Sequence, residues 1–324
     1  MQAPLRVAKE VLDRLSCPVC RSRLKLGDDA LACVGPECRR VFPVVDGVPV
    51  LINEAGSLFS IEDFVQHRDT TFAAVSRMKR MVLGLMPSLQ RNIVAKANYS
   101  EFARLLLDRG PKPIVLVLGG SRAGQGMEGF LSLRCVEFVE TDVAFGPRTD
   151  LICDAHDIPF DEGTFEGVVA QAILEHVVDP YRCVAEIHRV LKPDGIVYAE
   201  TAFMQQVHEG RYDFTRFTHL GHRRLFRSFE EISSGPACGP GMALAWSWRD
   251  FLRTFVESRL LRQAIMLLVS LTAWWLKYAD YFLVSKRGAY DCAAGYYFMG
   301  RRSDKVMPDR EVIEGYRGLV GIRS

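Results

Sequence analysis

From Pro111 onward, short runs typical of β-strands alternate with segments that have helical patterning. The strand-like runs are IVLVL, CVEFVE, DLICDA, FEGVVAQ and GIVYAET. Strands that alternate with helices in this way pack as a mainly parallel sheet with helices on both faces. The sequence therefore predicts an α/β fold built on a doubly wound sheet.

The first of these strands ends in a glycine-rich loop, VLVLGGSRAGQG, over residues 115–126. Such a loop brings the backbone close to a ligand, and dinucleotide, phosphate and S-adenosylmethionine sites all use one. The Gly-Lys-Ser/Thr sequence of a Walker-type phosphate loop is missing, which excludes that class. A dinucleotide and S-adenosylmethionine remain as alternatives for this loop.

Acidic residues end the next two strands, at Asp142 in FVETDV and at Asp154 in DAHDIPF. A carboxylate at the end of the second strand accepts both ribose hydroxyls in either class of cofactor. At the end of the third strand, a carboxylate is placed to bind an adenine amino group. The alternative for both residues is that of a plain turn acid.

Five motifs in order resemble the class I S-adenosylmethionine-dependent methyltransferases of type 11. They are VLVLGGSRAGQG, FVETDV, DAHDIPF, ILEHV and RVLKPDGIV, within about residues 90–232. A dehydrogenase would not account for DIPF and LKPDGIV. The resemblance implies an S-adenosylmethionine-dependent methyltransferase with these cofactor contacts: Gly119, Gly120 and Gly124 at the methionine end, Asp142 at the ribose, and Asp154 with Ala155 at the adenine.

The glycine loop departs from the family pattern at two positions. Val117 stands where an acid usually precedes the first glycine by two residues, and Ser121 replaces a glycine. That acid commonly helps to hold the amino group of the cofactor. Ser121 itself, or Asn98 or Tyr99 upstream, is the expected substitute.

Four cysteines cluster near the N-terminus: Cys17, Cys20, Cys33 and Cys38. Two closely spaced pairs joined by a strand-length arm suit a tetrahedral structural zinc site with no open coordination position. A redox or disulfide role is the alternative. The text LSCPVC followed by FPVVDGVPVLI, over residues 12–52, resembles the zinc-ribbon family that includes the small activator subunit of tRNA and translation-factor methyltransferases.

A histidine-rich segment, TAFMQQVHEGRYDFTRFTHLGHRRLFRSFEE, follows the fifth strand. Similar text occurs in a subset of the type 11 family and implies a lid that faces the substrate. An alcohol acceptor needs a base, and His has a suitable pKa. We expect His208 to be this base, oriented by Asp213 or Glu209.

Four further residues are expected to contact substrate, and arginines make this rim locally basic. The expected contacts are His176, Tyr212, Arg216 and His219. The arginines suit a phosphate or carboxylate clamp, with solvated side chains as the alternative. As the alternative, Glu175 and His176 have a structural role at the rim of the site, and His219 and His222 cap or line the helix of RRLFRSF. The spacing of the three histidines matches no metal-ligand pattern that we can defend.

The chain divides into four expected regions. Residues 1–53 form the zinc ribbon, 54–110 a helical linker or cofactor lid, 111–235 the methyltransferase domain and 236–324 a mostly helical cap. Near the end of the cap, GAYDCAAGYYFMGRR predicts a strand pair that returns to the sheet.

The most apolar stretch, AIMLLVSLTAWWLKYADYFLV, is interrupted by Lys277 and Asp280. A membrane span needs roughly 20 apolar residues. We therefore favour a buried helix, with a helix on a membrane surface and a span as alternatives. The helices of the C-terminal cap also suit a homodimer interface.

Charge and cysteine content bear on partners and compartment. A net charge of +2 gives no global basic field for nucleic acid. No signal peptide is apparent, and nine cysteines suit a reducing compartment, so we expect a cytoplasmic protein, with a place at the inner face of a membrane as the alternative. The expected activity is O- or N-methylation of a small-molecule, sugar or lipid-linked substrate. An rRNA or tRNA methyltransferase and a non-catalytic scaffold are the alternatives.

Overall fold

The computed structural model describes residues 5–70 and 87–319. Residues 71–86, which belong to the expected helical segment 54–110, lie outside the described residues. Within the described part of that segment, the structure has the helices α2 (Ile61–Val65) and α4 (Ala95–Leu107).

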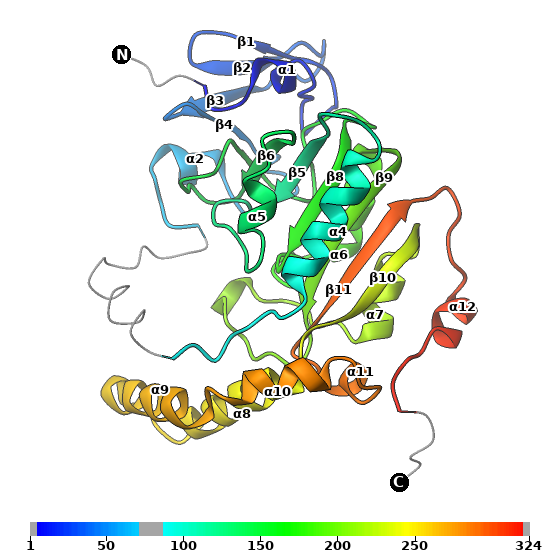
Figure 1. Cartoon of the computed structure of the whole chain (residues 1–324). Helices are drawn as coiled ribbons and strands as arrows, with labels where there is room; N and C mark the ends of the chain where they lie inside the picture. The colour runs from blue at the N-terminus through cyan, green and yellow to red at the C-terminus, as the bar shows by residue number, and fades with distance from the viewer. Residues whose placement is uncertain (1–4, 71–86, 320–324) are drawn as a thin grey trace.

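A twisted sheet in the order β7-β6-β5-β8-β9-β11-β10 forms the centre of the molecule (Figure 1). Its strands are β5 (Ile114–Leu118), β6 (Glu137–Asp142), β7 (Leu151–Cys153), β8 (Phe165–Gln171), β9 (Leu191–Ala202), β10 (Phe229–Cys238) and β11 (Gly295–Arg302). The first five in this order run parallel, and β11 lies antiparallel between β9 and β10. The prediction of a doubly wound, mainly parallel sheet is confirmed.

Alternate residues of the central strand face two separate hydrophobic cores. Val115 and Val117 pack in the core that includes α4, whereas Leu116 and Leu118 pack in the core that includes α6 (Pro180–Val190). This alternation follows from the two-residue period of a strand, and burial of both faces explains why IVLVL is continuously apolar. Two shorter helices complete the covering layers: α5 (Glu128–Leu131) and α7 (His219–Leu225).

The N-terminal region is a small antiparallel meander that extends this sheet. It comprises α1 (Lys9–Leu12), β1 (Leu24–Leu26), β2 (Ala30–Cys33), β3 (Val41–Val45) and β4 (Val48–Leu51). A hairpin joins β3 to β4, with Asp46 and Gly47 at positive φ angles of 52° and 78° in its turn. Positive φ at both central residues is the geometry that tight hairpins require.

Strand β4 pairs in parallel with β7, the edge strand of the central sheet. Val50 lies opposite Ile152, and Leu51 lies opposite Cys153. Away from the pairing, Arg21 donates from Nη1 to the carbonyl of Ile158 at 2.7 Å and from Nη2 to Glu186 at 2.9 Å. The ribbon is therefore hydrogen-bonded into the sheet as an extension of it.

The C-terminal region contributes both helices and one strand of the sheet. Its helices are α8 (Pro240–Thr254), α9 (Arg259–Ala273), α10 (Leu276–Leu283), α11 (Ala289–Cys292) and α12 (Asp309–Glu314). The segment predicted to return as a strand pair forms a single strand, β11, after the short helix α11. β11 inserts into the sheet, so the sheet is completed beyond residue 235, the expected end of the methyltransferase domain.

Helices α8, α9 and α10 form a layer at one end of the molecule (Figure 1). Asp280, fully buried in α10, accepts the backbone N–H groups of Gly241 and Met242 at 2.7 and 3.0 Å and so caps the N-terminus of α8. The expectation of a buried helix is wrong for most of this segment. Its helices pack against the rest of the molecule on one side only, and many of their large apolar side chains lie on the other side. Leu267, Leu271 and Trp275 are about half exposed.

No single helix in the described ranges, 5–70 and 87–319, is both long and apolar enough to cross a bilayer. Helices α9 and α10 reach that length and composition only as a pair bent by 47°.

Candidate functional site

A cleft of about 900 Å³, partly open to solvent, lies at the carboxyl ends of β5, β6, β7 and β8. This edge is where open α/β sheets bind their ligands. Its lining includes residues from each expected cofactor motif and from the histidine-rich segment: Gly119, Asp142, Asp154, Ala155, His176 and Tyr212. The structure therefore brings together groups that are far apart in the sequence.

Asp142 ends β6 with its carboxylate fixed by the backbone. Oδ2 accepts the N–H of Ser121 at 3.0 Å, and Oδ1 accepts the N–H of Val143 at 2.7 Å. Burial raises the pKa of this carboxyl, although the backbone N–H groups partly offset the effect. Each oxygen keeps a lone pair, so the side chain is positioned to accept two vicinal hydroxyls.

Asp154, at the end of β7, is held by groups from two sides. Oδ2 accepts the hydroxyl of Ser57 at 2.6 Å, and Oδ1 accepts the backbone N–H of His156 at 3.0 Å. Burial alone would raise the pKa of Asp154, but the hydrogen bond and charge of His156, with the hydroxyl of Ser57, hold it below its usual range. A ligand amino group at Asp154 would share or displace the Ser57 contact.

An aromatic wall stands beside Asp154. Phe59 and Tyr212 stack with ring centroids 5.7 Å apart and planes 29° apart, and both line the cleft. Phe59 follows the zinc ribbon in the chain, whereas Tyr212 belongs to the histidine-rich segment. Flat apolar surface of this kind suits a purine ring.

The glycine loop approaches the cleft mainly through Gly119, which has a positive φ of 68° and lines the cleft. Gly120 packs against the backbone and Cβ of Glu140. At Gly124, a Cβ atom would lie 1.8 Å from Oε1 of Gln171. Gly124 therefore makes room for a side chain of this protein, and its expected contact with the cofactor would run through Gln171.

Gln171 belongs to a buried polar network of which the sequence analysis had named only Tyr99. Its Nε2 donates to Glu200 at 2.9 Å, and its Oε1 accepts the hydroxyl of Tyr99 at 3.0 Å. Asn92 donates from Nδ2 to both oxygens of Glu200, at 2.9 and 2.8 Å. Burial raises the pKa of Glu200, which is 7% exposed.

Glu200 lies on the same face of the sheet as Val117, the position that lacks the family's acid. Val117 pairs with Val169, Val169 with Tyr198, and Gln171 with Glu200, so these side chains share one face. An acid that ends a strand, in GIVYAET, is the same signal that identified Asp142 and Asp154. It would have found Glu200 had it been applied to the fifth strand.

The segment after β9 forms a loop held together by Asp213 and Arg216. Arg216 donates to Asp213 (Nη2 to Oδ2, 2.8 Å) and to the carbonyl of Gln205 at 2.7 Å. Asp213 Oδ2 also accepts the backbone N–H of His208 at 2.9 Å. Burial opposes ionisation of Asp213, but Arg216 and the N–H of His208 hold its pKa far below the usual range.

His208 and His176 meet at the mouth of the cleft, with ring centroids 4.8 Å apart. Nδ1 of His208 lies 3.1 Å from the carbonyl of Gln206, and Nδ1 of His176 lies 2.9 Å from the carbonyl of Tyr212. Carbonyls only accept, so the ring of His176 carries its proton on Nδ1 and leaves Nε2 as a proton acceptor. Nδ1 of His208 lies near this carbonyl of Gln206 and also 3.4 Å from the side-chain amide nitrogen of Gln205. Burial, with the neighbouring His208, lowers the pKa of His176 to about 4.

Glu175 lies beneath the two histidines and is 1% exposed. One oxygen accepts the N–H of Ala202 at 3.3 Å, whereas Oε2 is buried and has no partner among the described residues. Burial raises the pKa of this carboxyl to about 7. The placement agrees with the structural rim that the sequence allowed for Glu175 and His176.

Two of the expected substrate contacts lie elsewhere or are already engaged. His219 is in α7, 5% exposed, with Nε2 3.2 Å from the hydroxyl of Ser234 and its ring 4.8 Å from that of Tyr290. It lines a helix, the alternative that the sequence allowed, and does not face the cleft. Arg216 is hydrogen-bonded within its own loop, so it orders the loop and is not a free anion clamp.

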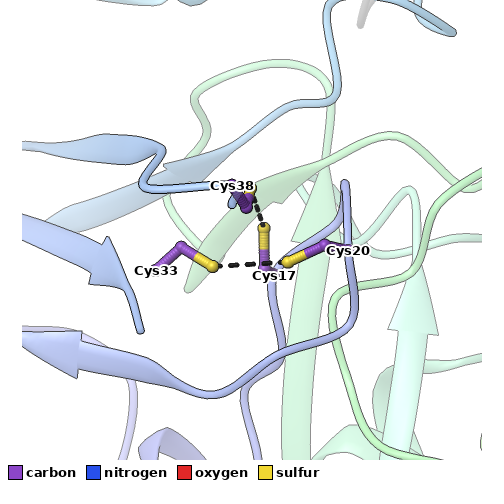
Figure 2. A group of neighbouring side chains, drawn as sticks. All are labelled: Cys17, Cys20, Cys33 and Cys38. Carbon is purple, nitrogen blue, oxygen red and sulfur yellow. Dashed lines mark hydrogen bonds between the residues drawn. The ribbon is translucent and has the colours of Figure 1, made fainter. Parts of the chain in front are cut away.

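The four expected zinc ligands come together in the ribbon (Figure 2). The Sγ atoms of Cys17 and Cys38 are 3.8 Å apart, those of Cys20 and Cys33 are 3.4 Å apart, and all four lie within 4.8 Å of one another. With Zn–S bonds of about 2.3 Å, tetrahedral geometry places sulfurs about 3.8 Å apart. The cluster fits a structural zinc ion.

Comparison with known proteins agrees with both parts of this arrangement. Residues 132–199 match the family model of a methyltransferase domain, of type 11, and residues 9–47 match that of Trm112p-like proteins. The chain joins a Trm112p-like zinc ribbon to a methyltransferase domain. The cofactor of such a domain is S-adenosylmethionine.

Relatives cover the two parts separately. The methyltransferase domain is similar to the ubiquinone/menaquinone biosynthesis C-methyltransferase UbiE of Desulfotalea psychrophila, 46% identical over 119 residues, or 36% of this chain and 48% of that protein. The ribbon is similar to a UPF0434 protein of Nitrosococcus oceani, 39% identical over 57 residues, or 17% of this chain and 93% of that protein.

Other similarities are shorter or weaker. The mitochondrial arginine-hydroxylase NDUFAF5 of Rattus norvegicus is 41% identical over 58 residues, and this chain spans 16% of its length. One chain of a solved complex between the Haloferax volcanii Trm112 methyltransferase activator and a methyltransferase is 18% identical to this chain. The match covers 66% of this chain and 94% of the other, with a TM-score of 0.37. The fold is therefore assigned from the strand order of this chain and not from this similarity.

Loss of the zinc ion should destabilise the methyltransferase domain along with the ribbon, because β4 is paired with β7. Metal analysis should find one zinc per chain, and Cys33→Ser should lower the free energy of unfolding by several kcal/mol. Cys135→Ser, at an exposed cysteine outside the cluster, is the matched control. A chain that contains no zinc, or a Cys33→Ser protein that unfolds like the wild type, contradicts the assignment.

Glu175→Gln should remove a pH dependence of stability. A carboxyl whose pKa rises on folding, here from 4.5 to about 7, favours the folded state most when protonated. Its contribution is complete below pH 4.5 and is lost as the pH rises through 7. Relative to Glu175→Gln, the wild type should lose up to about 3 kcal/mol between pH 4.5 and pH 8.

Urea unfolding at the two pH values measures this difference. Glu257→Gln, at an exposed carboxyl, is the control and should follow the wild type. Equal pH dependence in Glu175→Gln and the wild type would show that Glu175 does not titrate in this range.

Proposed function

We propose that this protein transfers a methyl group from S-adenosylmethionine to an oxygen or nitrogen atom of a small-molecule, sugar or lipid-linked acceptor. The observation that supports the proposal is the cleft itself, which is lined by Asp142, the aromatic wall and His176, with the ring of His208 packed against that of His176. The whole-chain charge of +2 favours such an acceptor over RNA.

The cofactor, when bound, supplies an electrophilic methyl carbon on a sulfonium. Asp142 would accept the ribose hydroxyls of the cofactor, and Ala155 with the Phe59–Tyr212 wall would enclose its adenine. The acceptor atom must lie about 3 to 3.5 Å from the methyl carbon and in line with the departing sulfur. His208, at the mouth of the cleft, is placed to take the proton that an alcohol or amine loses.

Asp213 and His176 are positioning residues in this scheme. Asp213 holds the backbone of His208 and also lies 3.4 Å from its Nδ1. His176, with a pKa lowered to about 4, is neutral near pH 7 and packs edge-to-face on His208 without repelling its protonated form. His208, the proposed general base, is therefore held in one orientation by Asp213 and His176.

Replacement of the base should separate catalysis from cofactor binding. His208→Ala should lower the methyl-transfer rate at least 100-fold while leaving the affinity for S-adenosylmethionine unchanged, since general-base catalysis typically contributes that much. His67→Ala, an exposed histidine outside the cleft lining, is the control. A fully active His208→Ala protein removes the base assignment.

The polar network around Glu200 favours a functional cofactor site over a non-catalytic scaffold. We infer that Glu200, acting through Gln171 and Asn92, supplies the negative charge that Val117 cannot provide at the methionine end. A carboxylate buried with three hydrogen-bond donors around it is costly to keep without a role, because burial penalises the charged form.

Calorimetry with S-adenosylmethionine tests this inference. Glu200→Gln should weaken cofactor binding roughly 10-fold, the size expected for loss of one charge-assisted interaction. Glu166 lies at the other end of β8 from Gln171, so the Glu166→Gln protein should bind the cofactor as the wild type does. Absence of heat with the wild-type protein at millimolar cofactor would support the scaffold instead.

A further inference from the structure

Helices α8, α9 and α10 present an unusually large set of exposed apolar side chains, which we name the C-terminal apolar face. The residues of this face are Leu244, Trp248, Phe251, Phe255, Leu260, Leu267, Leu271, Trp274, Trp275 and Phe282. Their exposed fractions run from 42% at Trp274 to 77% at Leu260. Exposed apolar side chains that contact one another, as the rings of Trp248, Phe251 and Phe255 do, are typical of interaction sites.

The spacing of these residues gives each helix one apolar stripe. On α8, Leu244, Trp248, Phe251 and Phe255 recur at intervals of four, three and four residues. Residues three or four apart lie on one side of a helix. Trp248, Phe251 and Phe255 also contact one another, with successive ring centroids 5.9 and 5.1 Å apart. The stripe is thus an ordered surface of packed rings.

The opposite sides of the same helices are already used in the core of this region. Met242, Ala245 and Trp246 of α8 and Val269 and Ala273 of α9 are buried together. The exposed stripes are therefore surplus to what packing of the helices requires. Among the described residues, nothing covers these stripes.

Charge on these helices indicates the chemistry of that partner. Residues 240–288 contain seven basic and three acidic residues. Asp280 is buried as a cap, and Asp250 is paired with Arg249 and Arg253. Arg259 and Arg262 are exposed beside the apolar stripe of α9. Exposed aromatic rings beside exposed arginines match the boundary between anionic headgroups and acyl chains.

The loop that carries His208 contacts α8, one of the helices that form this face. Ser247 of α8 accepts a hydrogen bond from Gln206 at 3.0 Å, and the ring of Trp246 lies 6.4 Å from that of His208. The loop that carries the proposed base is therefore attached to α8. An acceptor held at the C-terminal apolar face would be close to His208.

We propose that the C-terminal apolar face docks on an anionic phospholipid bilayer, with α8, α9 and α10 in the headgroup region. This inference rests on the proposed methyl transfer and narrows its acceptor to a hydroxyl or amine carried by a membrane lipid. Docking places that group at the histidines while the zinc ribbon stays at the far end of the molecule (Figure 1).

Vesicle flotation of the full chain tests the docking surface. The protein should float with vesicles that contain 30% phosphatidylglycerol and bind pure phosphatidylcholine vesicles at least 10-fold more weakly. Arg259→Gln/Arg262→Gln should weaken binding to the anionic vesicles roughly 30-fold. Leu267→Ser/Leu271→Ser should weaken binding to both kinds of vesicle at least 100-fold.

The matched control replaces two exposed apolar residues on another surface. Val306→Ser/Ile313→Ser, at side chains 53% and 68% exposed, should float as the wild type does. Failure of the wild type to float with either vesicle overturns the proposal. So does a dimer in solution that Leu267→Ser/Leu271→Ser converts to monomer without any lipid binding, which would assign the face to a second copy of the chain.

Cofactor calorimetry on the same proteins separates this inference from the proposed function. The flotation-defective variants should bind S-adenosylmethionine as the wild type does, because their substitutions lie outside the cleft. A wild-type protein that floats but binds no cofactor would support the docking surface and contradict the proposed function alone.

Discussion

Parallel pairing between β4 and β7 is the contact on which the rest of the arrangement depends. The zinc cluster orders the ribbon, the ribbon ends in β4, and β4 covers an edge of the central sheet that would otherwise expose unpaired backbone groups. The chain that leaves β4 then delivers Ser57 to Asp154 and Phe59 to the aromatic wall. A metal site far from the cleft therefore helps to shape the adenine side of it.

Much of the central sheet was predictable because its signals are local. Apolar runs of strand length alternate with helical segments, and acids at strand ends must meet at one edge of a parallel sheet, which brought Asp142 and Asp154 to the cleft. The cysteine spacing likewise defines the zinc cluster, because four soft ligands in two close pairs leave few other geometries. The positions of β4 and β11 were not predictable, since either strand could have paired at more than one edge.

The finer roles of site residues depend on contacts that a sequence does not display. His219 and Arg216 belong to the same motif-rich segment as His208, yet one packs between tyrosines and the other holds its own loop together. The partners of Glu200 could not be predicted from the sequence, because Asn92 precedes α4 and Gln171 ends β8, and only Tyr198 lies in the same strand. The exposed surface of α9 was misjudged because apolar composition does not reveal which side of a helix lacks a neighbour.

The buried carboxylate of Asp280 joins the start of α8 to α10, and α8 in turn holds the loop of His208 through Ser247. These hydrogen bonds link α10, α8 and the loop of His208 to one another. When the helices rest on a flat surface, the tilt of the molecule therefore sets the distance from that surface at which His208 meets its acceptor. Selection among acceptors would then follow from their height above that plane as much as from the shape of the pocket.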